Sequence, residues 1–552
     1  MKRKAVAAVL TAVMVASMFT GCGSDNGSSS AKSASAASAA SAANDTVDED
    51  GKVNGIMYQE GLPLVDEGDY TFSIFCDDSS ESGEFIMLDE FKKQTNVDVD
   101  LKIYPYETAT ERLNLDLNSG DYADVIGGWT LSDNAILTYG VNQGVFIPLE
   151  DYFEKYCPNI SAILDLPGVR EKMTAPDGHI YTIPYVCGDT TVGYSPYINT
   201  KWLENVGMSM PTTTDEFEAV LKAFKEQDAN GNGDASDEIP FSTDPNNKHI
   251  EAMAGYFGLP MNKLGIAIQD EKVVYGGVSN TYREFLSWFH KLYADGLVDV
   301  ELYTQDSSTW EGKGNQDLYG VSIAYGSNEF TGIPAAEERG DFDSMPVLNT
   351  DKGGIWLRDT EGFSVYRTQA VITNKAEHPE IICRWFDNAF ALENGIGCNR
   401  GPVGVIVNKE DDGYHAIDTT TLSEEDQEKY SWSNLWPQSL PKYLPADFEF
   451  VEEHPMYDEK KATEEAYEAN LTKEIIPSYW IDLDKIDTFS DTNTAIKDFF
   501  EQQQAQFVCG ELDIDNDADW QAYVDGMYSL GLEDWVATVS YTHLTLPTIL
   551  LV

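Results

Sequence analysis

The sequence predicts an α/β protein with parallel strands, built as two lobes. Short β-rich runs alternate with longer segments of helical periodicity, which is the pattern of a parallel sheet with helices on its faces. About 480 residues follow the low-complexity N-terminal region, more than one hydrophobic core usually organises. With 42% hydrophobic and 12% aromatic residues among 552, both lobes can be well packed.

The first elements are predicted to be a strand, a helix and a second strand. Tyr70–Cys76 (YTFSIFC) is expected to be a buried strand, and Glu84–Gln94 has apolar residues at helical spacing. Val97–Ile103 alternates as the next strand. A helix over Ala109–Asn118 and a strand over Asp121–Ile126 continue this βαβ order.

Two glycines and Trp129 follow the last of these strands. In open α/β sheets, ligands bind at the carboxyl ends of the strands, so Trp129 is a candidate ligand residue. The alternative is a tryptophan that closes the core beneath a glycine turn. Tyr181–Val186 is β-prone and follows an Asp-Gly turn, which suits a strand that crosses between lobes.

Two later segments are predicted to be helical. Pro211–Phe224 predicts an amphipathic helix capped by Thr213 or Thr214, which would be scaffold. Thr494–Phe507 is helix-like. The last residues, Thr538–Val552 (TVSYTHLTLPTILLV), break the amphipathic pattern and resemble translated sequencing-adapter read-through; the alternative is a genuine β-prone tail.

The N-terminus is typical of an export signal. A basic start precedes an apolar run over Ala5–Val15 and small residues before Cys22. These residues resemble the lipobox of bacterial lipoproteins, with Phe19 where leucine is usual, so Cys22 is expected to be lipidated; the alternative is a cleaved secretory signal. The apolar run is shorter than the ~20 residues of a spanning helix, so the lipid alone would hold the chain to the membrane. Gly23–Ala43 is almost entirely Ser, Ala and Gly, which indicates a flexible tether.

Charge and cysteine content exclude some classes of function. The net charge of −58 argues against nucleic-acid binding, because phosphates need clustered Lys and Arg, and it weakly favours a neutral ligand. Beyond Cys22 there are six cysteines with no CxxC pair, so the spacing proposes no disulfide and isolated buried thiols are expected.

Four segments in order carry a family resemblance. They are SGDYADVI (Ser119–Ile126), GVFIPLEDY (Gly144–Tyr152), PDGHIYTIPYV (Pro176–Val186) and the run Tyr197–Phe224. Together they resemble the extracellular solute-binding proteins of family 1, in the alginate-binding-protein-like branch, from about Tyr70 to Gly531. The resemblance implies a periplasmic-binding-protein-like fold: two α/β lobes joined by hinge crossings, with an interlobe ligand cleft. The expected division is a signal peptide (1–21), a tether (22–66), a first lobe (67–184 and 346–440), a second lobe (185–345 and 441–537) and a non-native tail (538–552).

A loop rich in oxygen donors predicts a structural Ca²⁺ site. Oxygen ligands alternate along the loop and a glycine stands at its sixth position, as calcium loops require. Position twelve is Ile239 in place of the usual Glu, so the last two acids are expected to complete the site, as in the resembled family. Ser236 is a one-residue insertion relative to that family. The alternative is a surface turn with Asx hydrogen bonds. The candidate ligands are Asp228, Asn230, Asn232, Asp234, Asp237 and Glu238.

Sugar binding needs aromatic faces for the C–H surfaces of the rings and planar polar groups for the hydroxyls. Aromatic residues beside glycines or in loops after strands are therefore favoured, above all Trp129, Trp356 and Trp436, followed by Tyr185, Tyr194 and Tyr325. Arg400 could donate two parallel hydrogen bonds to sugar hydroxyls or to a carboxylate; the alternative is a buried ion pair. Glu84 is a further candidate, although an acid there also favours the helix dipole.

These observations predict a lipid-anchored, extracytoplasmic substrate-binding protein of an ABC importer. It would be a monomer that encloses a saccharide, most simply a neutral oligosaccharide, and delivers it to the permease. Closure over the ligand would be the mechanism, without bond-making chemistry. The alternatives are a glycan-degrading lipoprotein, since a glycosidase needs only two suitably spaced carboxylates, and a sensing or recruiting lipoprotein for a peptide or another small solute.

Overall fold

The computed structural model describes residues 45–78, 84–244, 249–269, 272–332, 340–360, 362–445, 448, 450–451, 455–473, 475–476 and 480–545. The predicted signal peptide, the lipidation site at Cys22, most of the tether and residues 546–552 of the predicted tail lie outside the described residues. Within the described part of the chain, we find no helix with the length and apolar character needed to cross a membrane.

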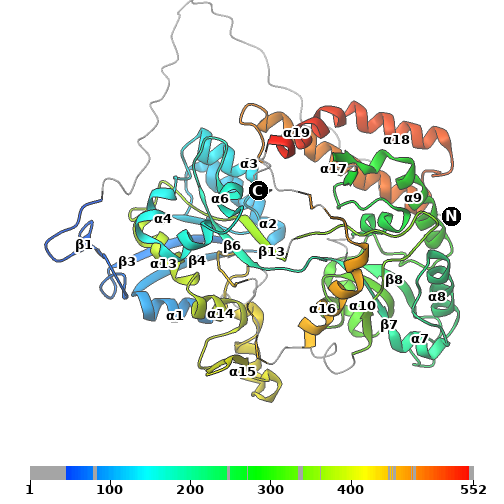
Figure 1. Ribbon diagram of the computed structural model, residues 1–552, viewed down its shortest axis with the longest axis horizontal. Coiled ribbons are helices and arrows are strands. Elements are labelled where there is room, and N and C mark those ends of the chain that lie inside the picture. Colours follow the sequence, from blue (N-terminus) through cyan, green and yellow to red (C-terminus); the bar gives the residue numbers. More distant parts are fainter. Residues whose placement is uncertain are drawn as a thin grey trace, which may run out of the picture. The chain divides into compact units, whose positions relative to one another are not determined.

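A five-stranded sheet organises the first lobe (Figure 1). β3 is parallel to β4 and β5, whereas β13 is antiparallel to β5 and β6. The parallel βαβ order predicted for the first strands is thereby confirmed. In spatial order the strands are β4 (Val97–Tyr104), β3 (Tyr70–Asp77), β5 (Val125–Gly127), β13 (Phe363–Ile372) and β6 (Thr182–Gly188).

Helices cover both faces of this sheet. Successive strand residues point to opposite faces, and apolar residues on each face are buried beneath helices. Phe72 and Ile74 of β3 belong to one core, and Phe75 belongs to the other. The second core is covered by α2 (Tyr106–Ser119) and the π-helix η2 (Ile136–Asn142), next to the short α3 (Asp133–Ala135). The first core is covered by α1 (Ile86–Thr95), α4 (Glu150–Tyr156), α5 (Pro158–Leu164), α6 (Val169–Met173), α13 (Pro379–Ala389) and α14 (Leu392–Arg400).

A four-stranded sheet organises the second lobe. β11 is parallel to β8 and antiparallel to β7, which also pairs antiparallel with β12. In spatial order the strands are β12 (Phe342–Ser344), β7 (Ser195–Asn199), β11 (Tyr319–Ala324) and β8 (Ile239–Thr243). Its principal helices are α7 (Thr200–Val206), α8 (Thr214–Glu226), η3 (Ile250–Phe257), α9 (Asn280–Ala294), α10 (Ser307–Asn315), α16 (Pro455–Tyr467), α18 (Asp517–Ser529) and α19 (Leu532–Thr545).

The helix α8 shows how local sequence sets an element. Thr213 accepts a hydrogen bond from the backbone N–H of Glu216 at 3.2 Å, so it is the helix cap, one of the two predicted candidates. The Glu216 carboxylate in turn accepts the N–H of Thr212 at 2.8 Å. This reciprocal arrangement is close to a capping box and satisfies amide groups that the first turn leaves open.

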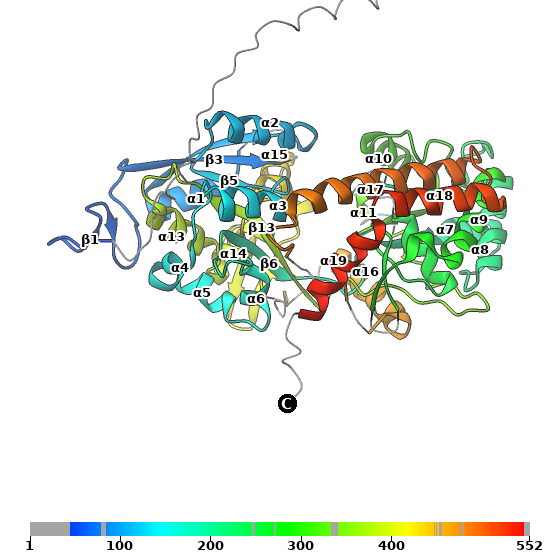
Figure 2. The same cartoon turned by 90° about the horizontal axis from the view of Figure 1, so that it is seen from above.

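The chain passes repeatedly between the two sheets. Residues 189–194 lead from β6 to β7, and residues 345–362 lead back from β12 to β13. Helix α17 (Ile486–Cys509) then joins both cores, because Ile486 packs in the first lobe and Phe500 packs in the second. In Figure 2 this helix runs from α3 toward α18.

The predicted tether does not extend to residue 66, because Val53, Met57 and Leu64 pack in the first-lobe core. The boundary predicted at 537/538 falls inside α19, and Val539 packs in the second-lobe core.

The predicted lobe boundaries also need correction in three places. The boundary at 184/185 falls inside β6, which continues to Gly188 in the first sheet. The boundary at 345/346 comes too early, since Leu348 and Trp356 pack in the second-lobe core. The boundary at 440/441 also comes too early, because the backbone of Val186 exchanges hydrogen bonds with Lys442 and Leu444.

Candidate functional site

Trp129 lies just beyond the carboxyl end of β5 in the first sheet, as the sequence predicts. The buried carboxylate of Asp77, the last residue of β3, accepts the N–H groups of Trp129 at 2.9 Å and Thr130 at 2.6 Å. Gly128 has φ +132°, and a Cβ there would come within 2.3 Å of that carboxylate, so the turn requires glycine. The turn leaves the Trp129 side chain 45% exposed. The alternative of a core tryptophan is therefore wrong.

Trp129 begins a row of aromatic side chains on the first lobe. Its ring meets Tyr366 of β13 edge-on, with centroids 5.4 Å apart. Tyr366 is stacked on Tyr185, its register partner on β6, also at 5.4 Å. The Lys442 Nζ lies 4.9 Å from the Tyr185 ring centroid and 5.9 Å from that of Trp432, which is 54% exposed. The row thus offers several aromatic surfaces beside one buried ammonium group.

A second aromatic group belongs to the second lobe. Tyr325, which follows β11, is 36% exposed and meets Tyr194 edge-on at 6.1 Å. Tyr194 is stacked on His249 at 4.1 Å. The Lys460 Nζ lies 3.9 Å from the Tyr325 centroid and donates to the carbonyl of Gly193 at 2.7 Å. These contacts bring the predicted Tyr194 and Tyr325 together.

Asp189 connects the two aromatic groups. It follows β6 directly, and its Oδ2 accepts from Ser364 Oγ at 2.6 Å and from the Tyr366 hydroxyl at 3.0 Å. Its Oδ1 accepts from the Tyr325 hydroxyl at 3.2 Å and from the N–H of Thr190 at 2.8 Å. One carboxylate therefore holds tyrosines from both sheets. The sequence analysis did not select Asp189, Tyr366 or Trp432.

Burial sets the protonation of the groups around these rings. Desolvation lowers the pKa of Lys442 and of Lys460 to about 8. Desolvation raises the pKa of Glu329 to about 7, although its carboxylate accepts the N–H of Tyr325 at 2.9 Å. The pKa of His249 falls to about 4 through burial, so its ring is neutral at pH 7. Lys442, Lys460 and Glu329 thus titrate close to neutral pH, where modest changes in pH alter the charge around the rings.

Two of the three favoured tryptophans belong to hydrophobic cores, which corrects the prediction that they contact ligand. Trp356 is 2% exposed and packs between Tyr256 at 5.7 Å and Tyr467 at 5.5 Å. Trp436 is fully buried against Trp385 at 5.7 Å. Neither ring offers a face to a solute.

The two predicted polar candidates lie in different surroundings. Arg400, the last residue of α14, donates to the carbonyl of Asn399 at 3.1 Å, and the Asn399 side chain accepts from the Tyr185 hydroxyl at 3.4 Å. Arg400 therefore lies beside the aromatic row. Glu84 is exposed and precedes α1. Its role in ligand binding stays a prediction.

The oxygen-rich loop has two sets of contacts. Asp237 accepts from the side-chain amides of Asn230 at 3.2 Å and Asn232 at 2.7 Å, and the N–H of Gly233 donates to Asp228 at 3.0 Å. Oxygens of the two asparagines and of Asp234 also accept N–H groups two residues on, as in Asx turns.

One carboxylate of this loop is incompletely satisfied. The Oε1 of Glu238 accepts the N–H of Ala229 at 2.9 Å, while its Oε2 is buried without a hydrogen-bond partner among the described residues. Burial accordingly raises the Glu238 pKa. A cation among these hard oxygen donors would satisfy that atom, so the residues fit calcium.

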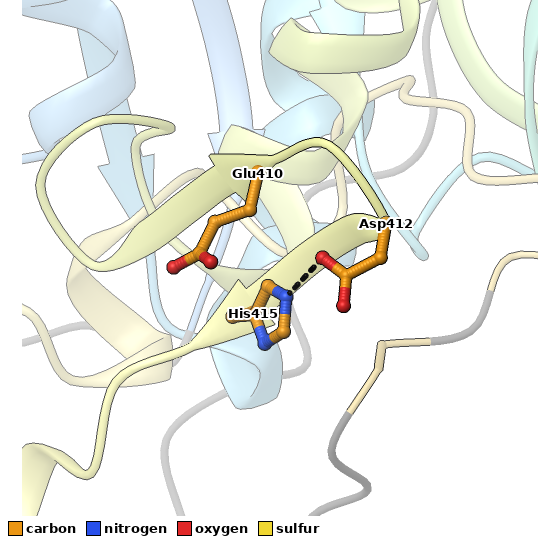
Figure 3. Close-up of side chains that lie close together, drawn as sticks. All are labelled: Glu410, Asp412 and His415. Carbon is orange, nitrogen blue, oxygen red and sulfur yellow. Dashed lines mark hydrogen bonds and ion pairs between the residues drawn. The ribbon is translucent and has the colours of Figure 1, made fainter.

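A separate polar cluster lies on the hairpin of β14 (Val407–Glu410) and β15 (Gly413–Ala416). Figure 3 shows Glu410, Asp412 and His415 together, with His415 Nε2 3.0 Å from an Asp412 oxygen. Both acids are exposed, and the hydrogen bond lowers the Asp412 pKa. The contact between Asp412 and His415 is a hydrogen bond at the surface.

Residues 78–395 match the family model described as "Bacterial extracellular solute-binding protein". The chain is 32% identical over 411 residues to the fructooligosaccharide ABC transporter substrate-binding protein FusA of Streptococcus pneumoniae, covering 72% of this chain and 70% of FusA. It is 28% identical to Lipoprotein LipO of Bacillus subtilis over 49% of this chain and 52% of LipO.

Solved structures of S. pneumoniae FusA are similar to this one. The FusA complex with kestose gives a TM-score of 0.75 at 26% identity and covers 85% of this chain and 98% of FusA. A FusA EF-hand mutant in complex with fructo-nystose gives a TM-score of 0.73 at 26% identity, covering 86% and 99%.

Proposed function

Because the chain belongs to the bacterial extracellular solute-binding protein family, we propose that it binds a saccharide between its two lobes and delivers it to the permease of an ABC importer. The observation that carries this proposal is the aromatic row Trp129–Tyr366–Tyr185, which Asp189 joins to Tyr325 of the other lobe. Aromatic faces pack on the C–H surfaces of sugar rings, and the carboxylate and hydroxyls orient the sugar hydroxyls.

The ligand we propose is a neutral oligosaccharide. The net charge of −58 and the carboxylates of Asp189 and Glu329 beside the tyrosines disfavour an anionic sugar. FusA, which is named for fructooligosaccharides, supports the choice of a short neutral sugar chain as the first probe. Binding across both lobes would shift the population toward a closed form, with no bond made or broken.

We also propose that the protein is exported, acts as a monomer and is anchored by a lipid on Cys22. The family name and the similarity to Lipoprotein LipO support this location. Calcium would be held by the loop from Asp228 to Glu238, where the buried Oε2 of Glu238 has no hydrogen-bond partner among the described residues. The ion would join the end of α8 to β8 as a structural element. The FusA EF-hand mutant supports a related loop in that relative.

Titration calorimetry tests the proposed function. The Cys22→Ala form, recovered in solution after export, would be titrated with kestose, longer fructooligosaccharides and other neutral saccharides, followed by product analysis. Micromolar or tighter binding with the sugar recovered intact supports an import receptor. Sugar cleavage, or binding of peptides but of no saccharide, would contradict it. Growth on the bound sugar after deletion of the gene separates import from sensing.

A further inference from the structure

Lys442 places a buried ammonium group at the end of the aromatic row. Its side chain is 1% exposed, and its Nζ donates to the side-chain oxygen of Gln438 at 2.7 Å. Among the described residues, Gln438 is the one acceptor within hydrogen-bonding distance of Nζ, and no carboxylate lies within ion-pair distance. An ammonium group carries three N–H donors, so the remaining donors of Lys442 meet no acceptor there.

The backbone around Lys442 is fixed beside β6. The N–H of Val186 donates to the carbonyl of Lys442 at 3.1 Å, and the N–H of Leu444 donates to the carbonyl of Val186 at 3.1 Å. Tyr443 forms a parallel bridge with Val186. This pairing places the lysine side chain beside Tyr185, whose ring centroid lies 4.9 Å from Nζ.

Gln438 is fixed by its own hydrogen bonds. Its side-chain nitrogen donates to the carbonyls of Trp432 and Trp436, both at 2.9 Å, so its side-chain oxygen is left for Lys442. Its backbone N–H donates to the carboxylate of Asp78 at 2.7 Å. Because the amide nitrogen has donors only, the glutamine offers Lys442 a single acceptor atom.

The charges around Lys442 compensate its burial only in part. Cys187 of β6 and Cys398 of α14 are thiols whose pKa is raised by burial, to about 11 for Cys187, so both are neutral at pH 7. The Asp78 carboxylate attracts the ammonium group, and Arg400 repels it. Desolvation outweighs these charges and lowers the pKa of Lys442 to about 8. The group is therefore charged at pH 7, but a small rise in pH neutralises it.

A saccharide would supply what this ammonium group lacks. A buried donor without an acceptor destabilises the fold, because it has lost its hydrogen bonds to water. Sugar hydroxyl oxygens are acceptors, and sugar rings pack on aromatic faces such as those beside Nζ. Trp432, whose centroid lies 5.9 Å from Nζ, is 54% exposed, so a ligand can approach the ammonium group along this ring.

We infer that Lys442 is a specificity-determining residue of the saccharide site: its ammonium group donates hydrogen bonds to hydroxyl oxygens of the sugar unit that packs on Tyr185 and Trp432. The inference rests on the proposed binding of a saccharide. Because a charged lysine has donors and no acceptor, the site requires an oxygen acceptor at this place. A sugar unit that lacks the hydroxyl, or carries a charged amino group there, should be rejected.

Ligand binding should therefore be linked to proton uptake. Oxygens that accept from the ammonium group favour its charged form, so the pKa of Lys442 rises when the ligand binds. Well below pH 8 the group is charged in both states, and its titration does not affect the affinity. Above pH 8 the free protein has lost the proton and takes it up again on binding, so the affinity falls by up to about tenfold per pH unit.

Titration calorimetry of the Cys22→Ala parent in buffers of different ionisation enthalpy counts the protons. The probe is the saccharide that binds most tightly among kestose, longer fructooligosaccharides and the other neutral saccharides. The parent should take up close to one proton at about pH 9 and almost none at about pH 6.5. Lys442→Met should lose this uptake and bind about tenfold more weakly at about pH 7.

Denaturant unfolding distinguishes ligand contact from a structural role. Since methionine removes a buried charge, Lys442→Met should unfold at no lower denaturant concentration than the parent. Lys409→Met is the matched control. Lys409 of β14 also lies near a tyrosine, 5.6 Å from the Tyr414 centroid, but it is 57% exposed and paired with Glu393 at 2.7 Å. This variant should keep the affinity and the proton uptake of the parent.

The outcomes separate this inference from the proposed function. Saccharide binding by the parent without proton uptake overturns the inference and leaves the proposed function standing. A Lys442→Met variant that loses stability but keeps the affinity and the proton uptake also overturns it, because the lysine is then structural. If this variant does not fold, the proton count and the pH dependence of the parent decide. Failure of every saccharide to bind overturns the proposed function, and this inference with it.

Discussion

Replacing Trp129 by alanine is expected to weaken saccharide binding about tenfold while changing folding little. The indole is 45% exposed, and its one ring contact among the described aromatic side chains is the edge-on meeting with Tyr366 at 5.4 Å. Such a pair contributes about 1 kcal/mol to the free energy of unfolding. The turn itself is held by backbone bonds to Asp77, which the substitution keeps.

The magnitude follows from the exposed area. Aromatic side chains present roughly 250 Å² at most, so about 110 Å² of Trp129 faces solvent. A sugar ring that covers half of this area removes about 55 Å² from water, worth about 1.4 kcal/mol at 25 cal/mol per Å². That free energy corresponds to about a tenfold change in Kd.

The assay pairs calorimetry with denaturant unfolding, and Trp356→Phe is the matched control. Trp356 is 2% exposed in the second-lobe core, so the control should lose roughly 1–3 kcal/mol of unfolding free energy and keep the wild-type Kd. The two tryptophans thus should separate affinity from stability. An unchanged Kd in Trp129→Ala, or a loss of affinity in the Trp356 variant alone, would refute the reasoning.

Three further predictions concern charge, metal and membrane. Glu329→Gln should flatten the pH dependence of stability. The pKa of Glu329 is raised from 4.5 to about 7 in the folded protein, so binding of its proton stabilises the fold fully below pH 4.5. This contribution is lost as the pH rises through 7. Denaturant midpoints between about pH 5 and about pH 8 check the slope, and an unchanged slope contradicts it. Glu238→Gln and Asp228→Ala should lower the melting temperature in calcium but barely in chelator, and equal losses in both conditions would count against a metal site. Cys22→Ala should move the protein from the membrane fraction to the soluble fraction, so unchanged retention would argue against lipidation.

The sequence predicted what depends on local pattern. A short β-rich apolar run identified β3, period-two alternation identified β4, and helical periodicity identified α1 within two residues of its observed start. Thr213 could be proposed as a cap because capping chemistry involves residues three apart. Trp129 was selected for the same kind of reason, since two glycines and a strand end constrain a turn before any tertiary contact is known.

The tryptophans show where local sequence pattern no longer predicts whether a side chain is buried. Trp432 and Trp436 are four residues apart in SWSNLWP, yet one is 54% exposed and the other is fully buried. The difference is made by Trp385 and Phe91, whose rings fill the space around Trp436 at 5.7 and 5.0 Å. The neighbouring residues could have indicated this difference. Ser431 and Ser433 flank the exposed ring, whereas Leu435 and Pro437 flank the buried one.

Asp189 could not be selected by residue type, because the chain has 94 acids. Its place was nonetheless implied: a strand that crosses between lobes must end where groups from both lobes can meet. A carboxylate there accepts from Tyr366 on one oxygen and from Tyr325 on the other, since it has enough lone pairs for both and each tyrosine donates its hydroxyl hydrogen. We therefore expect sugar hydroxyls that reach Asp189 to replace its hydrogen bonds from Tyr325 and Tyr366. Ligand binding would then be coupled to the relative placement of the two tyrosines.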